Sequence, residues 1–104
     1  MARMTGYAVA CYDKPGPEAA QIRDEKMAEH LAHIETTLDK LWIAGPLFGD
    51  AGVIGSLLIY KAETPEEARA LAMADPYGQA GIWERVEVSR FVGAAGDWVG
   101  GKTW

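Results

Sequence analysis

The segment TPEEARALAMADPYGQAGIWERVEVSRF, residues 64–91, predicts a helix, a chain reversal and a strand in direct succession. Thr64 suits the N-cap of a helix and Pro65 suits its first position, where a missing N–H costs nothing. Glu67 stands three residues after Thr64 and completes the pattern of a capping box. The segment TPEEARALAMA is therefore predicted to be a helix that begins at Thr64.

The end of the same segment alternates in a way that predicts a strand. From Trp83 to Phe91, apolar and polar residues take turns, which is typical of a strand with one buried face. Val86 and Val88 would share the buried face. The opposite face would carry Arg85, Glu87 and Ser89.

Asp75, in the stretch ADPYGQAGIWE between this helix and this strand, has two possible interpretations. A residue that precedes a proline avoids helical geometry, so Asp75 ends the helix in either case. In the first interpretation it is the N-cap of a short helical turn that has Pro76 at its first position. In the second it is half of a catalytic pair whose other member lies far upstream.

The chain upstream predicts a strand, a long helix and two further strands. Residues 7–12 form an apolar run that ends at a Pro- and Gly-rich loop, and residues 18–40 contain neither Pro nor Gly. Residues 41–46 read as a strand that ends at Gly45 and Pro46, followed by a turn-rich LFGDAG and a strand in VIGSLLIYKA. The predicted order βαββαβ is that of an α+β, ferredoxin-like antiparallel sheet with both helices on one face.

The long helix has an apolar stripe at spacings of three and four, which predicts one buried face. Relative to its centre, His30 lies about 60° away, at the edge of the core, and His33 about 120° away, toward solvent. His30 is then either a half-buried packing residue or a catalytic one. The two histidines lack a third ligand, so no metal site is predicted. The stripe consists of Met27, Leu31, Ile34, Leu38 and Leu41.

The third predicted strand is apolar on both faces, so both sides of the sheet need a cover. Val53, Leu57 and Ile59 alternate with Ile54, Leu58 and Tyr60. One possible cover for the second face is another copy of the same sheet, giving a homodimer. The other is the Gly-rich tail, residues 93–104, which is either mobile or packed by Trp98 and Trp104.

Length and composition limit the remaining possibilities. A chain of 104 residues fits one domain, here residues 1–92 with the tail 93–104. The net charge of −5 and the lack of a basic cluster argue against a nucleic-acid partner. The single cysteine, Cys11, is expected to be a buried small hydrophobe in a reducing compartment. The amino-terminal apolar run is too short for a signal peptide or a membrane span, so a cytoplasmic location is expected.

The motifs HLAHI, AGP, GSLLIYKAETPEEARALAMADPY and AGIWERVEVSRF resemble, in this order and spacing, the YCII-related (YciI-like) family of small dimeric α+β barrel proteins. The resemblance covers residues 7–91. It implies that His30 and Asp75 form an active-site pair, and that Ser56, Gly45 and Pro46 line the same cleft. On pattern alone, Ser56 could instead be a small packing residue, and Gly45 with Pro46 a turn.

Such a pair would work by acid–base chemistry, with His30 as the base and Asp75 fixing its tautomer. The chain has no phosphate loop, nucleophilic serine motif or cofactor fingerprint, so no cofactor is expected and the reactions in reach are proton abstraction, isomerisation and elimination on a small molecule. At least one member of the family is a dehydrochlorinase of a chlorinated hydroxyquinol. The alternative is a non-catalytic module that binds a small ligand. Four aromatic residues could either line a pocket or belong to the core: Trp42, Phe48, Tyr77 and Trp83.

Overall fold

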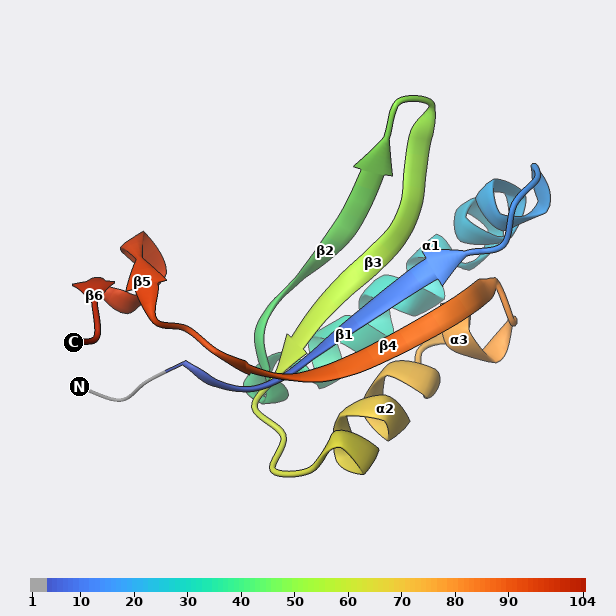
Figure 1. Ribbon diagram of the computed structural model, residues 1–104. Coiled ribbons are helices and arrows are strands. Elements are labelled where there is room, and N and C mark those ends of the chain that lie inside the picture. Colours follow the sequence, from blue (N-terminus) through green and yellow to red (C-terminus); the bar gives the residue numbers. More distant parts are fainter. Residues whose placement is uncertain (1–3) are drawn as a thin grey trace.

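A four-stranded antiparallel sheet is the centre of the computed structural model, which describes residues 4–104 (Figure 1). The strands are β1 (Thr5–Asp13), β2 (Leu41–Gly49), β3 (Gly52–Tyr60) and β4 (Trp83–Val92), in the spatial order β2-β3-β1-β4. The two central strands, β1 and β3, are adjacent and antiparallel, with Cys11 opposite Ser56.

The helices all lie on one face of this sheet (Figure 1). They are α1 (Glu18–Thr36), α2 (Pro65–Met73) and the short α3 (Pro76–Gln79), and a 3-10 turn, η1 (Leu38–Lys40), leads into β2. The predicted α+β, ferredoxin-like order βαββαβ is confirmed. Within residues 4–104, no helix combines the length and the hydropathy needed to cross a membrane.

Helix α1 ends earlier than the sequence pattern predicts. Instead of running to Lys40, it stops at Thr36 because two threonine side chains compete for its last carbonyls. The Thr36 hydroxyl donates to the carbonyl of His33 at 2.6 Å, and the Thr37 hydroxyl donates to that of Ile34 at 3.1 Å. The chain then tightens into η1, so Leu38 and Leu41 are not part of the α-helix.

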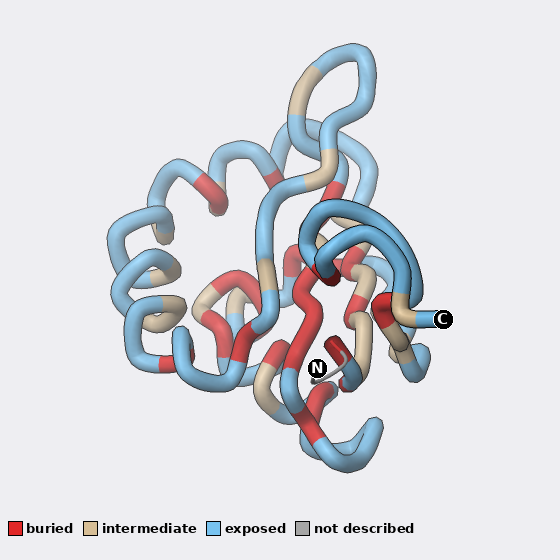
Figure 2. The backbone as a smooth tube through the Cα atoms, turned by 90° about the vertical axis from the view of Figure 1, so that its left-hand side faces the viewer, coloured by how far each residue is buried: buried red, intermediate tan, exposed pale blue. Residues whose placement is uncertain are grey.

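Ile34 and Leu41 of the predicted stripe contact the core, but the rest of the stripe does not. Met27 is 44% exposed and Leu31 is 52% exposed, and the residues of α1 that are buried are Ala19 and Arg23. In Figure 2 the helical coils are mostly exposed, with buried positions scattered along them. The helix-side core includes residues of β1, β3, α2 and α3. The stripe faces the sheet across an open cleft, described below. Periodicity therefore predicted the direction of this face correctly, but it predicted more burial than Met27 and Leu31 have.

Strand β2 continues through Gly45 and Pro46, where the sequence predicted its end. Both residues pair with β3, Gly45 opposite Leu57 and Pro46 opposite Ser56. A proline is tolerated there because β2 is an edge strand and its outer side needs no N–H donor. The turn is consequently shorter than LFGDAG and consists of Asp50 and Ala51, with Gly49 opposite Gly52.

The starts of α2 and α3 follow their sequence signals. The Thr64 side chain accepts a hydrogen bond from the Glu67 N–H at 3.1 Å. Asp75 has an extended backbone, and its Oδ1 accepts from the Tyr77 N–H at 2.8 Å. A Cβ on Gly78 would lie 3.0 Å from the Trp83 ring and 3.1 Å from two backbone carbonyls, which explains a glycine in so short a helix. The first interpretation of Asp75, as an N-cap, is therefore correct.

The two faces of the sheet carry separate apolar clusters. The helix-side core includes Val9, Leu58 and Tyr60, with Val86 and Val88 packed against it as predicted. The second face holds a smaller cluster made of Met4, Ile59 and Val99, with Leu57 and Ile43 beside it. The alternation predicted for β3 thus holds from Leu57 to Tyr60. Val53 differs because it lies at the tip of the β2–β3 hairpin and lines the cleft on the helix side.

The tail forms a small hairpin beyond the end of the sheet (Figure 1). Its strands are β5 (Ala95–Gly96) and β6 (Gly101–Lys102), joined by the 3-10 turn η2 (Asp97–Val99). The buried residue of the hairpin is Val99, which lies on the second face, whereas Trp98 and Trp104 are each 75% exposed. Of the two alternatives for the tail, packing by these tryptophans is therefore wrong. A short hairpin of this kind covers one end of the second face and leaves the rest open.

Cys11 lies fully buried in the helix-side core, and burial raises the pKa of its thiol to about 12, with the nearby Asp75 carboxylate as a further cause. We expect alkylation by iodoacetamide at mildly alkaline pH to be about three orders of magnitude slower in the folded protein than in the unfolded chain, because only the thiolate reacts. Mass spectrometry of samples with and without concentrated guanidinium chloride measures this ratio. Rapid labelling of the folded protein would contradict it.

Candidate active site

A cleft of about 570 Å³ separates α1 from the β2–β3 hairpin. Every predicted site residue except Asp75 lines it: His30 from α1, Gly45 and Pro46 from β2, Ser56 from β3 and Tyr77 from α3. The aliphatic side of the cleft comes from the α1 stripe. The cleft thus exists because α1 and the hairpin enclose space between them instead of packing together. Its remaining wall includes Met27, Leu31, Ile34, Phe48, Val53 and Leu58.

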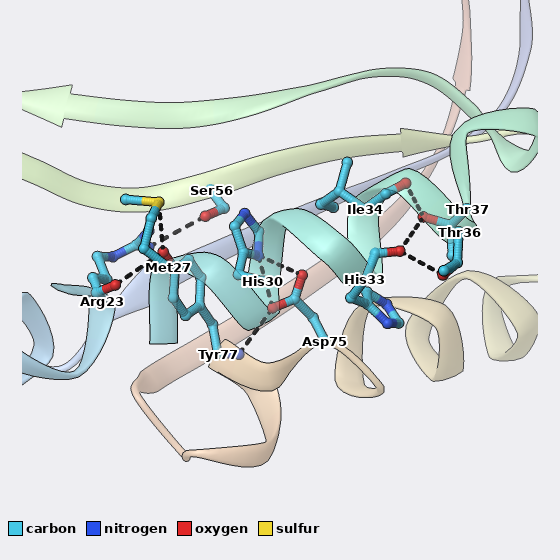
Figure 3. Close-up of polar contacts among 10 residues, drawn as sticks. All are labelled: Arg23, Met27, His30, His33, Ile34, Thr36, Thr37, Ser56, Asp75 and Tyr77. Atoms are coloured by element: carbon cyan, nitrogen blue, oxygen red, sulfur yellow. Dashed lines mark hydrogen bonds and ion pairs between the residues drawn. The ribbon is translucent and has the colours of Figure 1, made fainter. Parts of the chain in front are cut away.

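His30 and Asp75 are in direct contact, although 45 positions separate them in the chain. The Nδ1 atom of His30 lies 2.7 Å from Oδ2 and 2.9 Å from Oδ1 of Asp75 (Figure 3). A carboxylate only accepts hydrogen bonds, so Nδ1 carries the proton and Nε2 of the neutral ring is a free base. Figure 3 shows Nε2 pointing away from Asp75, on the sheet side of α1.

Asp75 acts on α3 and on α1 at the same time. It is 1% exposed, and its Oδ1 accepts from both the Tyr77 backbone N–H and the His30 ring. Its backbone is extended by the following Pro76, which aims the carboxylate at these two donors. The two interpretations of Asp75 are thus geometrically compatible, since the capping carboxylate is the one that contacts His30.

Tyr77 fixes the plane of the His30 ring. The two rings are stacked, with centroids 4.1 Å apart and an interplanar angle of 13°. The Tyr77 hydroxyl donates to the backbone carbonyl of Arg23 at 3.2 Å, which ties α3 to α1 at a second point. Burial raises the pKa of this phenol, against an opposing effect of the Arg23 guanidinium, so the hydroxyl stays protonated and remains a donor. The His30 ring is therefore held at its edge by Asp75 and on its face by Tyr77.

Arg23 and Asp13 complete the polar groups of the site, and the sequence analysis missed both. Arg23 Nε and Nη2 donate to the two carboxylate oxygens of Asp13 at 2.7 and 2.8 Å, and Nη2 also donates to Ser56 Oγ at 3.2 Å. Arg23 stands seven residues before His30, which is two helical turns, so both residues lie on the same face of α1. That spacing was the available signal for Arg23, whereas no pattern in the sequence marked Asp13.

The remaining predicted candidates fall outside the site or on its rim. Phe48 is exposed at the mouth of the cleft, whereas Trp83 is buried in the core. Trp42 lies away from the cleft and donates from Nε1 to the Thr5 carbonyl at 2.9 Å. In the described part of the chain, the His30 ring is bonded to Asp75 and not to His33, and the His33 carbonyl accepts from the Thr36 hydroxyl. Residues 4–104 contain no group of three His, Cys, Asp or Glu side chains placed to share a metal ion.

Comparison with known proteins places this chain in a family. The model of the YCII-related domain matches residues 5–92, which include every residue of the cleft. The chain belongs to the YCII-related family. Two relatives named Protein YciI, one from Escherichia coli O6:H1 (strain CFT073) and one from Shigella flexneri, are each 35% identical over 94 residues, covering 82% of this chain and 94% of the relative.

A solved structure of an enzyme with a YCII-like fold is similar to this chain. It is the 5-chloro-2-hydroxyhydroquinone dehydrochlorinase TftG from Burkholderia phenoliruptrix AC1100, in complex with 2,5-dihydroxybenzoquinone. The TM-score is 0.73 at 30% sequence identity, and the match covers 88% of this chain and 95% of the neighbour. A protein of the same fold thus acts on a small hydroxylated ring.

The double contact of Asp75 predicts that its removal costs more stability than the removal of an ordinary cap. Asp75→Ala should lower the free energy of unfolding by about 2–4 kcal/mol, because it leaves two donors without an acceptor. Asp75→Asn keeps an oxygen for the Tyr77 N–H and should cost about 1 kcal/mol. Denaturant titration measures both losses.

The matched control is Thr64→Ala at the start of α2, where the side chain only caps its helix. Its expected cost is about 1 kcal/mol. Equal losses for Thr64→Ala and Asp75→Ala would show that the contact with His30 adds nothing to stability.

Proposed function

We propose that this chain is a lyase or isomerase that acts by acid–base chemistry on a small hydroxylated aromatic or quinone-like molecule, with His30 as the base. One observation carries the proposal: His30 lines the cleft while its Nδ1 lies 2.7 Å from the buried carboxylate of Asp75. This contact leaves Nε2 unprotonated in the neutral ring, so the nitrogen available to a substrate is the one that can take a proton.

In the proposed step, His30 Nε2 removes a proton from a carbon of the bound ring or from a ring hydroxyl. The electron pair left behind moves into the ring toward an oxygen substituent. In an elimination, this pair returns from the oxygen to form a new ring double bond while the leaving group departs from the adjacent carbon with the electrons of its own bond, and the imidazolium gives its proton to the leaving group or to water. In an isomerisation, the imidazolium instead returns the proton at a different carbon. Asp75 stabilises the imidazolium in both cases because its negative charge contacts the other ring nitrogen.

The shape of the cleft supports a small, flat substrate. Its volume of about 570 Å³ lies in the range of small-molecule sites, and aliphatic side chains such as Met27 and Leu31 form one wall. On the opposite wall, Gly45 is paired with Leu57 of the second face, so it presents backbone rather than a side chain to the cleft. The dehydrochlorinase with the same fold, solved with a dihydroxylated quinone, supports an aromatic substrate class.

His30→Gln should lower turnover by about 10²–10⁴-fold, because glutamine cannot accept the proton. The measurement is absorbance change on a panel of hydroxyquinols and dihydroxybenzoquinones, with chloride release for the chlorinated members. The control is His33→Gln on the same helix, which should leave turnover unchanged. Turnover that survives His30→Gln contradicts the proposal. Tight binding without turnover of any panel member would favour the non-catalytic ligand-binding module.

We further propose that the open part of the second sheet face pairs with a second copy of the chain, to give a homodimer. This face has an apolar groove along β2 and β3 with exposed Trp98 at one rim, and the tail covers only one end of it. Leu57 is half-buried there, and its face is too apolar to stay in contact with water.

Light scattering after gel filtration should give twice the mass of one chain. Leu57→Lys should halve that mass because it buries a charge at the paired faces, whereas Ala28→Lys on the exposed side of α1 should not change it. A monomeric wild-type chain would contradict the homodimer.

A further inference from the structure

Arg23 is a buried cation that the proposed proton transfer does not use. It is 8% exposed, and Asp13 binds it through both carboxylate oxygens at 2.7 and 2.8 Å. A buried ion pair adds little net stability over a well-packed apolar pair, because both charges lose their hydration. Its position is also unusual for a purely structural pair, since Arg23 lines the cleft beside Tyr77, with the guanidinium 4.8 Å from the ring centroid.

The guanidinium retains donors for a further acceptor. Nε and Nη2 are engaged by Asp13 and Ser56, whereas Nη1 has no hydrogen-bond partner among residues 4–104. In the described part of the chain, the fully buried side-chain atom without a hydrogen-bond partner is Trp83 Nε1. Nη1 of Arg23 is therefore not fully buried. The free N–H groups of Arg23 therefore keep access to the cleft or its solvent.

Ser56 extends this donor group toward His30. Its Oγ accepts from Arg23 Nη2 at 3.2 Å, so its own hydroxyl hydrogen is left to donate to something else. Figure 3 shows Ser56 on the sheet side of α1, between Arg23 and His30. Arg23 and His30 are two helical turns apart, about 10 Å along the helix axis. A substituted six-membered ring is long enough to reach from one to the other.

We propose that Arg23 and Ser56 form a subsite that binds an ionised oxygen of the substrate, which makes an acidic hydroxyl or an enolate oxygen on the ring a requirement for binding. This inference rests on the proposed function, because it says which residues bind the end of the substrate that His30 does not contact. When His30 removes a proton, the electron pair moves toward this oxygen, and the Arg23 charge and the Ser56 hydroxyl stabilise it. Asp13 partly offsets the charge of the guanidinium.

Binding of 2,5-dihydroxybenzoquinone, measured by isothermal titration, tests the subsite without any turnover. Arg23→Lys and Ser56→Ala should each weaken binding by about 10- to 100-fold, the usual effect of losing a hydrogen bond to a charged group. Asp13→Asn should instead strengthen it by about threefold or more, because the Arg23 charge is then less neutralised. The unsubstituted ring 1,4-benzoquinone should bind weakly to all forms.

The opposite signs separate this subsite from a structural ion pair. A purely structural role predicts that Arg23→Lys and Asp13→Asn weaken binding alike, and that result would overturn the inference. Arg85→Lys is the matched control, since Arg85 is exposed on β4, pairs with Glu87 and lies outside the cleft. Binding that Arg23→Lys and Ser56→Ala leave unchanged overturns the subsite alone. Failure of the wild-type chain to bind overturns the proposed substrate class together with the subsite.

Discussion

The buried carboxylate of Asp75 connects the helices beside the cleft. Asp75 ends α2, caps α3 and meets His30 of α1 at 2.7 Å, so a single buried group fixes three helices relative to one another. Its charge has to be satisfied because it is removed from water, and each of its donors belongs to a different element or turn. Helix α1 can therefore stand away from the sheet without becoming loose, since it is held from the α3 side.

The same constraint explains why a cleft persists where a core was expected. Apolar residues at helical spacing normally mark a face that packs on the sheet, and Met27 and Leu31 fit that pattern. Tyr77 holds α1 at two points: its ring stacks on His30, and its hydroxyl donates to the Arg23 carbonyl. Helix α1 is thus supported from α3. Met27 and Leu31 are left lining the cleft, where under the proposed function their apolar side chains would contact the ligand.

Local signals predicted most of the fold, and tertiary contacts decided the rest. Thr64 and Asp75 cap their helices as their neighbours in sequence indicate, because capping depends on a few consecutive residues. The end of β2 was wrong because tolerance of Pro46 depends on which strand lies at the sheet edge, which no local pattern contains. The contact between His30 and Asp75 came from the family resemblance, whereas the pairing of Arg23 with Asp13 depends on the packing of α1 over β1 and gave no local signal.

Strand β2 is shared between the two sides of the molecule. Ala44, Gly45 and Pro46 line the cleft on the helix side and also the apolar groove on the second face. At Gly45 only the thickness of a backbone separates the two spaces, because there is no side chain to insulate one from the other. A partner chain on the second face and a ligand in the cleft would then contact the same segment of β2. A displacement of this segment by one of them would change the space available to the other. A substitution at Ala44, Gly45 or Pro46 that alters the cleft would therefore also alter the groove on the second face.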